Sequence, residues 1–167
     1  RDAAEMLATL KFRGHDLAAV FTGASREAQQ KLKFARALDY FEDHVYGYDS
    51  LEHDKGDLTS KAVYRHAMWK SRSAPDESII VSDTPDAIAE GQLIKPMALV
   101  GYLDPYLNDD EIDLRLKEMR QAGAHFAVVG GNAVSTIPEF LLSNRGLKNF
   151  REAADLRHRP WPGMTLE

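Results

Sequence analysis

The stretch SIIVSDTPDAIAEG, from Ser78 to Gly91, carries the strongest structural signal in the chain. It begins with an apolar run of strand length that ends on an acid, Asp83. Thr84 and Pro85 follow, and after them comes a segment of helical composition whose first turn holds the proline, a position where proline is favoured. The stretch therefore predicts a buried strand that leads through a short polar connection into a helix.

The composition is that of an ordinary soluble globular domain. The 167 residues are 44% apolar and 28% charged, with a formal net charge of -5. This mildly acidic balance disfavours a nucleic-acid surface. The chain has no cysteine, which excludes disulfides, thiolate catalysis and cysteine metal ligands. No apolar run approaches the roughly 20 residues that span a bilayer, so we expect no membrane partner and residence in the cytoplasm.

Strand-like and helix-like segments alternate along the chain. Strands are predicted at 16–23, 44–49, 78–83, 97–102 and 125–131, and helices at 1–14, 25–38, 59–71, 85–92, 109–123 and 135–143. This alternation, with strands that are continuous apolar runs, predicts an α/β fold built on a doubly wound, Rossmann-like parallel sheet. We expect one core domain over residues 1–143 and a surface extension over residues 144–167.

Several polar residues predict how the helices begin. Ser25 is expected as the N-cap of one helix, and either Thr59 or Ser60 as the N-cap of another. Asp83 has two interpretations at this stage, because a carboxylate between a strand and a helix can be an N-cap or a ligand. Trp69 is expected to serve packing.

The strand ends predict a binding site, because ligands of parallel α/β sheets lie beyond the carboxyl ends of the strands. Thr22 and Gly23 follow one strand, and Asp83 ends another. A hydroxyl and free backbone N–H groups at a helix N-terminus can bind an anionic phosphate. A carboxylate can hold a hard cation such as Mg²⁺, which usually takes one or two protein carboxylates. The sequence thus predicts a phosphate-plus-cation site.

Four features in this order resemble the haloacid dehalogenase superfamily of phosphatases, in particular its phosphoglycolate-phosphatase and phosphonatase-like branches. AVFTGAS is similar to the second family motif, and Lys61 opens the helix before the acidic strand. IIVSDTPDAIAEG is similar to the acidic motif GDTPxDIxAG, and GAHFAVVGGNAVSTIPEFL is similar to the closing strand and helix. The resemblance covers about residues 3 to 142.

The resemblance implies a Mg²⁺-dependent phosphatase that acts on a small phosphorylated molecule. Thr22 and the backbone N–H of Gly23 would bind the transferring phosphoryl group. Lys61 would neutralise charge on the phosphate and on an aspartyl nucleophile. Asp83 would bind Mg²⁺, with Asp86 as the second metal-binding carboxylate. Such chemistry is mostly positioning and electrostatic stabilisation of spread negative charge.

The chain departs from the family pattern at the nucleophile. The motif DxDxT, which carries the nucleophilic aspartate on a central strand, has no match in residues 1–30. We therefore expect a core that lacks its first strand and its cap, as the C-terminal part of a longer protein. Otherwise the missing strand comes from a partner chain, or the sheet is rebuilt. We expect no turnover from the 167 residues alone. The alternative function is a non-catalytic domain of the same fold, kept for binding or assembly.

Two further departures concern the acidic motif and the lysine. Aligned without gaps, the second aspartate of the family falls on Ala87, and Asp86 stands one place early. Ser82 replaces the usual glycine. Lys55 competes with Lys61 for the role of the motif lysine, and both assignments stay open.

Overall fold

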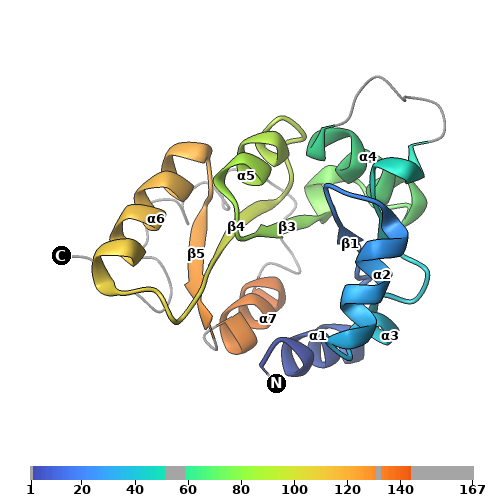
Figure 1. Ribbon diagram of the computed structural model, residues 1–167, viewed down its shortest axis with the longest axis horizontal. Helices are drawn as coiled ribbons and strands as arrows, with labels where there is room; N and C mark the ends of the chain where they lie inside the picture. Colours follow the sequence, from blue (N-terminus) through green and yellow to red (C-terminus); the bar gives the residue numbers. More distant parts are fainter. Residues whose placement is uncertain (1, 52–58, 131–132, 144–167) are drawn as a thin grey trace. The chain divides into compact units, whose positions relative to one another are not determined.

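The computed structural model describes residues 2–51, 59–130 and 133–143. The described residues divide into two compact units, an N-terminal unit up to residue 74 and a C-terminal unit from residue 75 to residue 143, and each is described by itself. The N-terminal unit contains α1 (Asp2–Phe12), β1 (Ala19–Val20), α2 (Ser25–Phe34), α3 (Leu38–Phe41), β2 (Val45–Tyr46), the 3₁₀ turn η1 (Tyr48–Ser50) and α4 (Ser60–Lys70). The C-terminal unit contains the 3₁₀ turn η2 (Pro75–Glu77), β3 (Ile79–Ser82), α5 (Pro85–Gln92), β4 (Ala98–Leu103), α6 (Asp109–Ala122), β5 (Phe126–Val129) and α7 (Ala133–Ser143) (Figure 1).

The N-terminal unit is built on a short parallel pair, in which Ala19 of β1 lies opposite Val45 of β2 and Val20 lies opposite Tyr46. Because side chains alternate along a strand, the pair has two apolar faces. One face forms a cluster with α2 and the other a cluster with α4. The first cluster contains Ala19, Val45 and Ala28, and the second contains Tyr46, Leu51, Val63 and Ala67. The pair is therefore covered on both sides, as in a doubly wound sheet.

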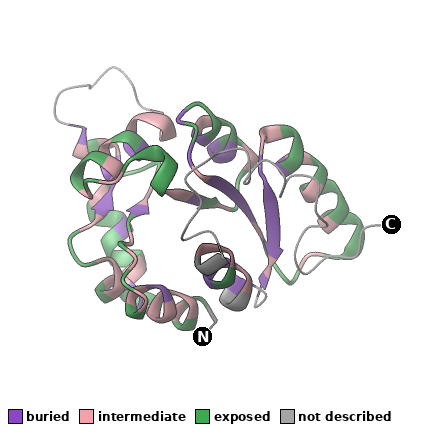
Figure 2. Ribbon diagram, turned by 180° about the vertical axis from the view of Figure 1, so that it is seen from behind, coloured by how far each residue is buried: buried purple, intermediate pink, exposed green. Residues whose placement is uncertain are grey.

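The C-terminal unit is built on a three-stranded parallel sheet in the order β3-β4-β5. Most residues of β4 and β5 are buried, and Figure 2 shows both strands buried along most of their length. Helices α5 and α6 lie on one side of the sheet and α7 lies on the other (Figure 1). On the α7 side, the rings of Phe126 and Phe140 pack with their centroids 4.9 Å apart.

The prediction of a parallel α/β fold is confirmed, although its strands form two sheets in the described residues. The predicted strand at 16–23 is shorter than expected, because only Ala19 and Val20 form a regular strand. Hydrogen bonds from Ala19 N–H to His44 O and from Phe21 N–H to Tyr46 O extend the ladder slightly. Thr22 and Gly23 consequently lie in a turn after the strand.

The residues that cap the helices correct the prediction for Ser25 and decide between the alternatives for α4 and α5. Ser25 is not an N-cap: that position is Ala24, and Ser25 is the first residue of α2. Thr59 caps α4, its hydroxyl accepting the N–H of Ala62. Thr84, and not Asp83, caps α5.

The predicted helix at 25–38 is also interrupted. It ends at Phe34, because Arg36 takes a left-handed conformation with φ of 56°. The N–H of Ala37 then bonds the carbonyl of Leu32, and α3 starts at Leu38. No described helix is long and apolar enough to cross a membrane. The proposed extension at 144–167 lies outside the described residues.

Candidate functional site

Thr22 and Gly23 are solvent-exposed in the turn that joins β1 to α2. We refer to residues 22–25 as the β1 turn. No other described residue contacts the Thr22 hydroxyl through a hydrogen bond. The turn precedes a helix of ten residues, so its N–H groups stand at the positive end of the α2 dipole. Phosphate binding at these groups stays a prediction from the sequence.

Asp49, on η1 after β2, binds the β1 turn from the neighbouring strand end. Its Oδ1 accepts the backbone N–H of Ser25 at 2.8 Å, and its Oδ2 accepts the Ser25 hydroxyl at 2.8 Å. The Ser25 hydroxyl thus donates to a carboxylate that is distant in the sequence, and it is not used to cap α2. The carboxylate takes over part of the capping of α2, since a negative charge is stabilising at a helix N-terminus.

The two strand ends also touch through their backbones. The N–H of Tyr48 donates to Gly23 O at 3.0 Å. A Cβ at Gly47 would come within 2.2 Å of Gly23 O and 2.8 Å of Ser25 N, both of them main-chain atoms. Only glycine fits at position 47 without a displacement of the backbone, although its φ of -136° suits any residue.

The hydrogen bonds of Ser25 alter the acidity of Asp49. Burial acts to raise the pKa of this carboxyl, but the bonds from the Ser25 N–H and hydroxyl favour the charged form. The net result is a pKa of Asp49 below its ordinary value. Asp49 is therefore ionised at neutral pH and carries a negative charge next to the β1 turn.

Lys61 lies in the first turn of α4 and is half-buried. Its neighbour Ala62 packs against the second cluster of the N-terminal unit, as does Tyr48 of η1. Helix α4 also contacts η1 directly. The start of α4 therefore lies at the same end of the strand pair as the β1 turn. Lys55, the other lysine considered, lies outside the described residues.

Asp83 is exposed directly after β3, in the C-terminal unit. The hydroxyl of Ser82 accepts the N–H of Thr84 at 3.2 Å, and the hydroxyl of Thr84 accepts the N–H of Ala87 at 3.4 Å. These bonds fix the connection without using the carboxylate of Asp83, and no described residue donates to it. Ser82, the substitute for the family glycine, thus shapes the turn that presents Asp83.

Asp86 is exposed in the first turn of α5, whereas Ala87 is buried. The position on which the second family aspartate falls therefore faces the core, and the carboxylate one place earlier faces solvent. Two exposed carboxylates at one strand end fit a Mg²⁺ ion that keeps most of its waters. Within the described residues, no group of three or more His, Asp or Glu side chains could hold a metal.

The predicted site residues are distributed over both units. Thr22, Gly23 and Lys61 lie at one end of the N-terminal unit, and Asp83 and Asp86 lie at the carboxyl end of β3 in the C-terminal unit. The structure brings the β1 turn together with Asp49, a residue that the sequence did not single out. The only signal for Asp49 in the sequence is its place in the tripeptide Gly47-Tyr48-Asp49, which directly follows the second strand.

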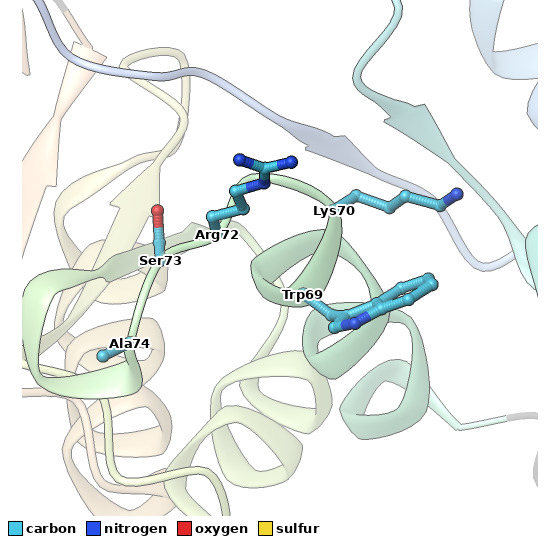
Figure 3. Close-up of a pocket in the computed structure, with 5 residues that line it drawn as sticks. All are labelled: Trp69, Lys70, Arg72, Ser73 and Ala74. Atoms are coloured by element: carbon cyan, nitrogen blue, oxygen red, sulfur yellow. The ribbon is translucent and has the colours of Figure 1, made fainter.

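A shallow pocket of about 650 Å³ lies away from these residues, at the C-terminal end of α4. It is lined by Trp69, Lys70, Arg72, Ser73 and Ala74 (Figure 3). Trp69 is 69% exposed and so is not a core residue, although its ring packs against that of His66 with centroids 5.8 Å apart. Lys70 Nζ lies 4.9 Å from the centre of the indole ring, a cation–π contact.

The fold is similar to that of a conserved haloacid dehalogenase-like protein of unknown function from Agrobacterium tumefaciens str. C58. The TM-score of the superposition is 0.65 at 15% sequence identity, over 83% of this chain and 59% of that chain. The chain has a haloacid dehalogenase-like fold. It spans less than two thirds of this neighbour, and no protein-family model and no curated protein matches it. Similarity at this identity shows the fold alone.

Proposed function

We propose that the chain contributes the phosphate-binding and metal-binding parts of a Mg²⁺-dependent phosphatase of the haloacid dehalogenase type. The observation that carries the proposal is that the β1 turn and the first turn of α4, which holds Lys61, lie at the same end of the β1–β2 pair. Thr22 and Gly23 are exposed there, and the first turn of α4 lies at the same end. A hydroxyl, a backbone N–H and an ammonium group are the donors that a phosphate monoester needs.

The position of Lys61 supports a functional role. A cation in the first turn of a helix opposes the helix dipole, and α4 has no acidic residue in that turn to offset it. A bound phosphate would supply the missing negative charge. In this proposal Thr22 and the Gly23 N–H donate to phosphoryl oxygens, and Lys61 offsets the charge that spreads over them during transfer.

Asp83 and Asp86 are the proposed Mg²⁺ ligands. The two carboxylates would hold the metal through direct and water-mediated contacts. Support comes from the exposure of both groups and from a turn whose hydrogen bonds leave Asp83 available. Residence in the cytoplasm stays a prediction from the sequence.

The proposal includes an upstream segment or partner chain that brings the nucleophilic aspartate and a strand. Val81, in the middle of β3, is 42% exposed, whereas Val100, opposite it on β4, is fully buried. Interior strands of parallel sheets are normally covered on both faces. In the described residues β3 pairs with β4 alone, so a further strand and its helix would cover Val81.

The test is hydrolysis of a generic aryl phosphate with and without Mg²⁺. We expect no turnover from the 167 residues alone, and Mg²⁺-dependent turnover when the nucleophile-bearing segment is present. Asp83→Asn should abolish this turnover, while Asp113→Asn, which removes an exposed carboxylate from α6 of the same unit, should leave it unchanged. Absence of Mg²⁺-dependent turnover from the completed protein would favour the non-catalytic binding or assembly domain.

A further inference from the structure

We propose that Asp49 is a positioning residue that holds the β1 turn in the conformation required for anion binding. This inference deepens the proposed function and rests on it for the identity of the anion. Asp49 itself binds no substrate in this proposal. Its effect passes through Ser25, two residues after Gly23 and three after Thr22.

The contacts are those of a clamp between two strand ends. Both carboxylate oxygens of Asp49 are engaged by one residue, at 2.8 Å each, so the carboxylate fixes the Ser25 backbone and side chain together. Bonds to a charged acceptor are stronger than neutral ones. The backbone bond from Tyr48 N–H to Gly23 O, at 3.0 Å, joins the same two segments. The turn is thereby held at Gly23 and at Ser25.

Two consequences follow for the exposed donors. With the Gly23 carbonyl bonded to Tyr48, the peptide plane between Gly23 and Ala24 has a fixed orientation, and the Gly23 N–H, one Cα away, is restrained through it. The Ser25 N–H is used by Asp49, so an anion bound at the turn would rely on Thr22 and on the N–H of Gly23. Asp49 also places a negative charge near that anion, an unfavourable electrostatic contribution that a purely geometric role must outweigh.

Geometry and charge can be separated by substitution. Asparagine at position 49 keeps an oxygen that can accept the Ser25 N–H and an amide that can donate to the Ser25 hydroxyl, but it removes the charge. Alanine removes both. A positioning role therefore predicts that Asp49→Asn binds phosphate at least as well as the wild type, whereas Asp49→Ala binds it about tenfold more weakly.

The experiment is a titration of ¹⁵N-labelled protein with inorganic phosphate, followed through the backbone amide resonances of Gly23 and Ser25. Asp39→Asn, which removes an exposed carboxylate from α3 of the same unit, is the control and should match the wild type. Resonances of the buried residue Val63, in the core of the same unit, report whether each variant is folded. In the wild type, the Ser25 amide shift should also titrate with a midpoint below about 3.9, the ordinary value for an aspartate.

The outcomes separate this inference from the proposed function. Equal phosphate affinity of Asp49→Ala and the wild type would overturn the positioning role, and so would equal weakening by Asp49→Ala and Asp49→Asn. If the wild type binds no phosphate, the proposed function fails. Hydrogen exchange of the Ser25 amide still tests the positioning role of Asp49 in that case. Exchange that is faster in Asp49→Ala but not in Asp49→Asn supports this role, and unchanged exchange in Asp49→Ala refutes it.

Discussion

Gly47→Ala is expected to destabilise the N-terminal unit through a steric clash between two main-chain segments. The added Cβ would lie 2.2 Å from Gly23 O and 2.8 Å from Ser25 N, closer than real Cβ contacts in proteins. Neither atom belongs to a flexible side chain, so the two strand ends must separate by about 1 Å, which is overpacking of a kind that costs about 1–3 kcal/mol. Backbone strain adds nothing, because φ of -136° at Gly47 is accessible to alanine.

The same separation stretches the hydrogen bonds that join the strand ends. A neutral backbone bond contributes about 0.5–1.5 kcal/mol and a bond to a charged group about 1.5–3 kcal/mol, with the lower part of the second range applying to the exposed Asp49. The clash and the stretched bonds arise from the same separation of the strand ends, so their contributions do not add in full. We therefore expect the free energy of unfolding to fall by about 2–3 kcal/mol.

Urea denaturation followed by circular dichroism measures this change. Gly23→Ala is the matched control, because its added Cβ would meet nothing closer than Glu27 Oε2 at 3.9 Å. At such a site alanine usually stabilises by about 0.4–1 kcal/mol, through the entropy of the unfolded chain. A loss below about 0.5 kcal/mol in Gly47→Ala, or a loss of equal size in Gly23→Ala, would refute the reasoning.

Three further predictions concern the C-terminal unit. His125→Phe removes the ring nitrogen that accepts the N–H of Leu99 at 2.8 Å in the buried core, so the free energy of unfolding should fall by about 1–3 kcal/mol in urea denaturation. Thr84→Ala removes the N-cap of α5 and should lower it by about 1 kcal/mol, while Thr84→Ser should retain most of it. Gly91→Ala would bring a Cβ to 2.9 Å from Leu99 Cδ2 and 3.2 Å from Ile80 Cδ1, both ends of flexible side chains that can shift, and alanine gains about 1 kcal/mol over glycine inside a helix. We expect the free energy of unfolding in urea to change by less than about 1 kcal/mol, and a loss of about 3 kcal/mol, as in severe overpacking, would contradict this.

Acidification should weaken the contact between Ser25 and Asp49. The pKa of Asp49 is lowered in the folded protein, so the carboxylate contributes stability that is fully present above the unfolded value of about 3.9. That contribution is lost as the pH falls through the lower folded-state pKa. Comparison of the wild type with Asp49→Asn between pH 7 and pH 2 measures it, because the difference between their unfolding free energies should shrink only at the acid end.

The sequence by itself determined the order of most elements and which polar residues stand at the strand ends. Thr59 was readable as one of two candidate caps, because N-capping depends on residues within one turn of the chain, whereas the cap candidate Asp83 stands one place before the actual cap, Thr84. Asp83 was readable as the end of a strand, because an apolar run that stops at an acid followed by Thr-Pro is a local pattern. These signals need no knowledge of distant contacts.

The tertiary structure alone decided the pairing of Ser25 with Asp49. The two residues are 24 positions apart, and only the parallel register of β1 and β2 brings their segments together. Ser25 therefore had the sequence of an N-cap but not the role, since a carboxylate from the next strand end competes for its hydroxyl. The exposure of Trp69 and of Val81 was equally hidden from the sequence, because burial depends on which element covers a face, whereas an apolar pattern records only that the residue could be covered.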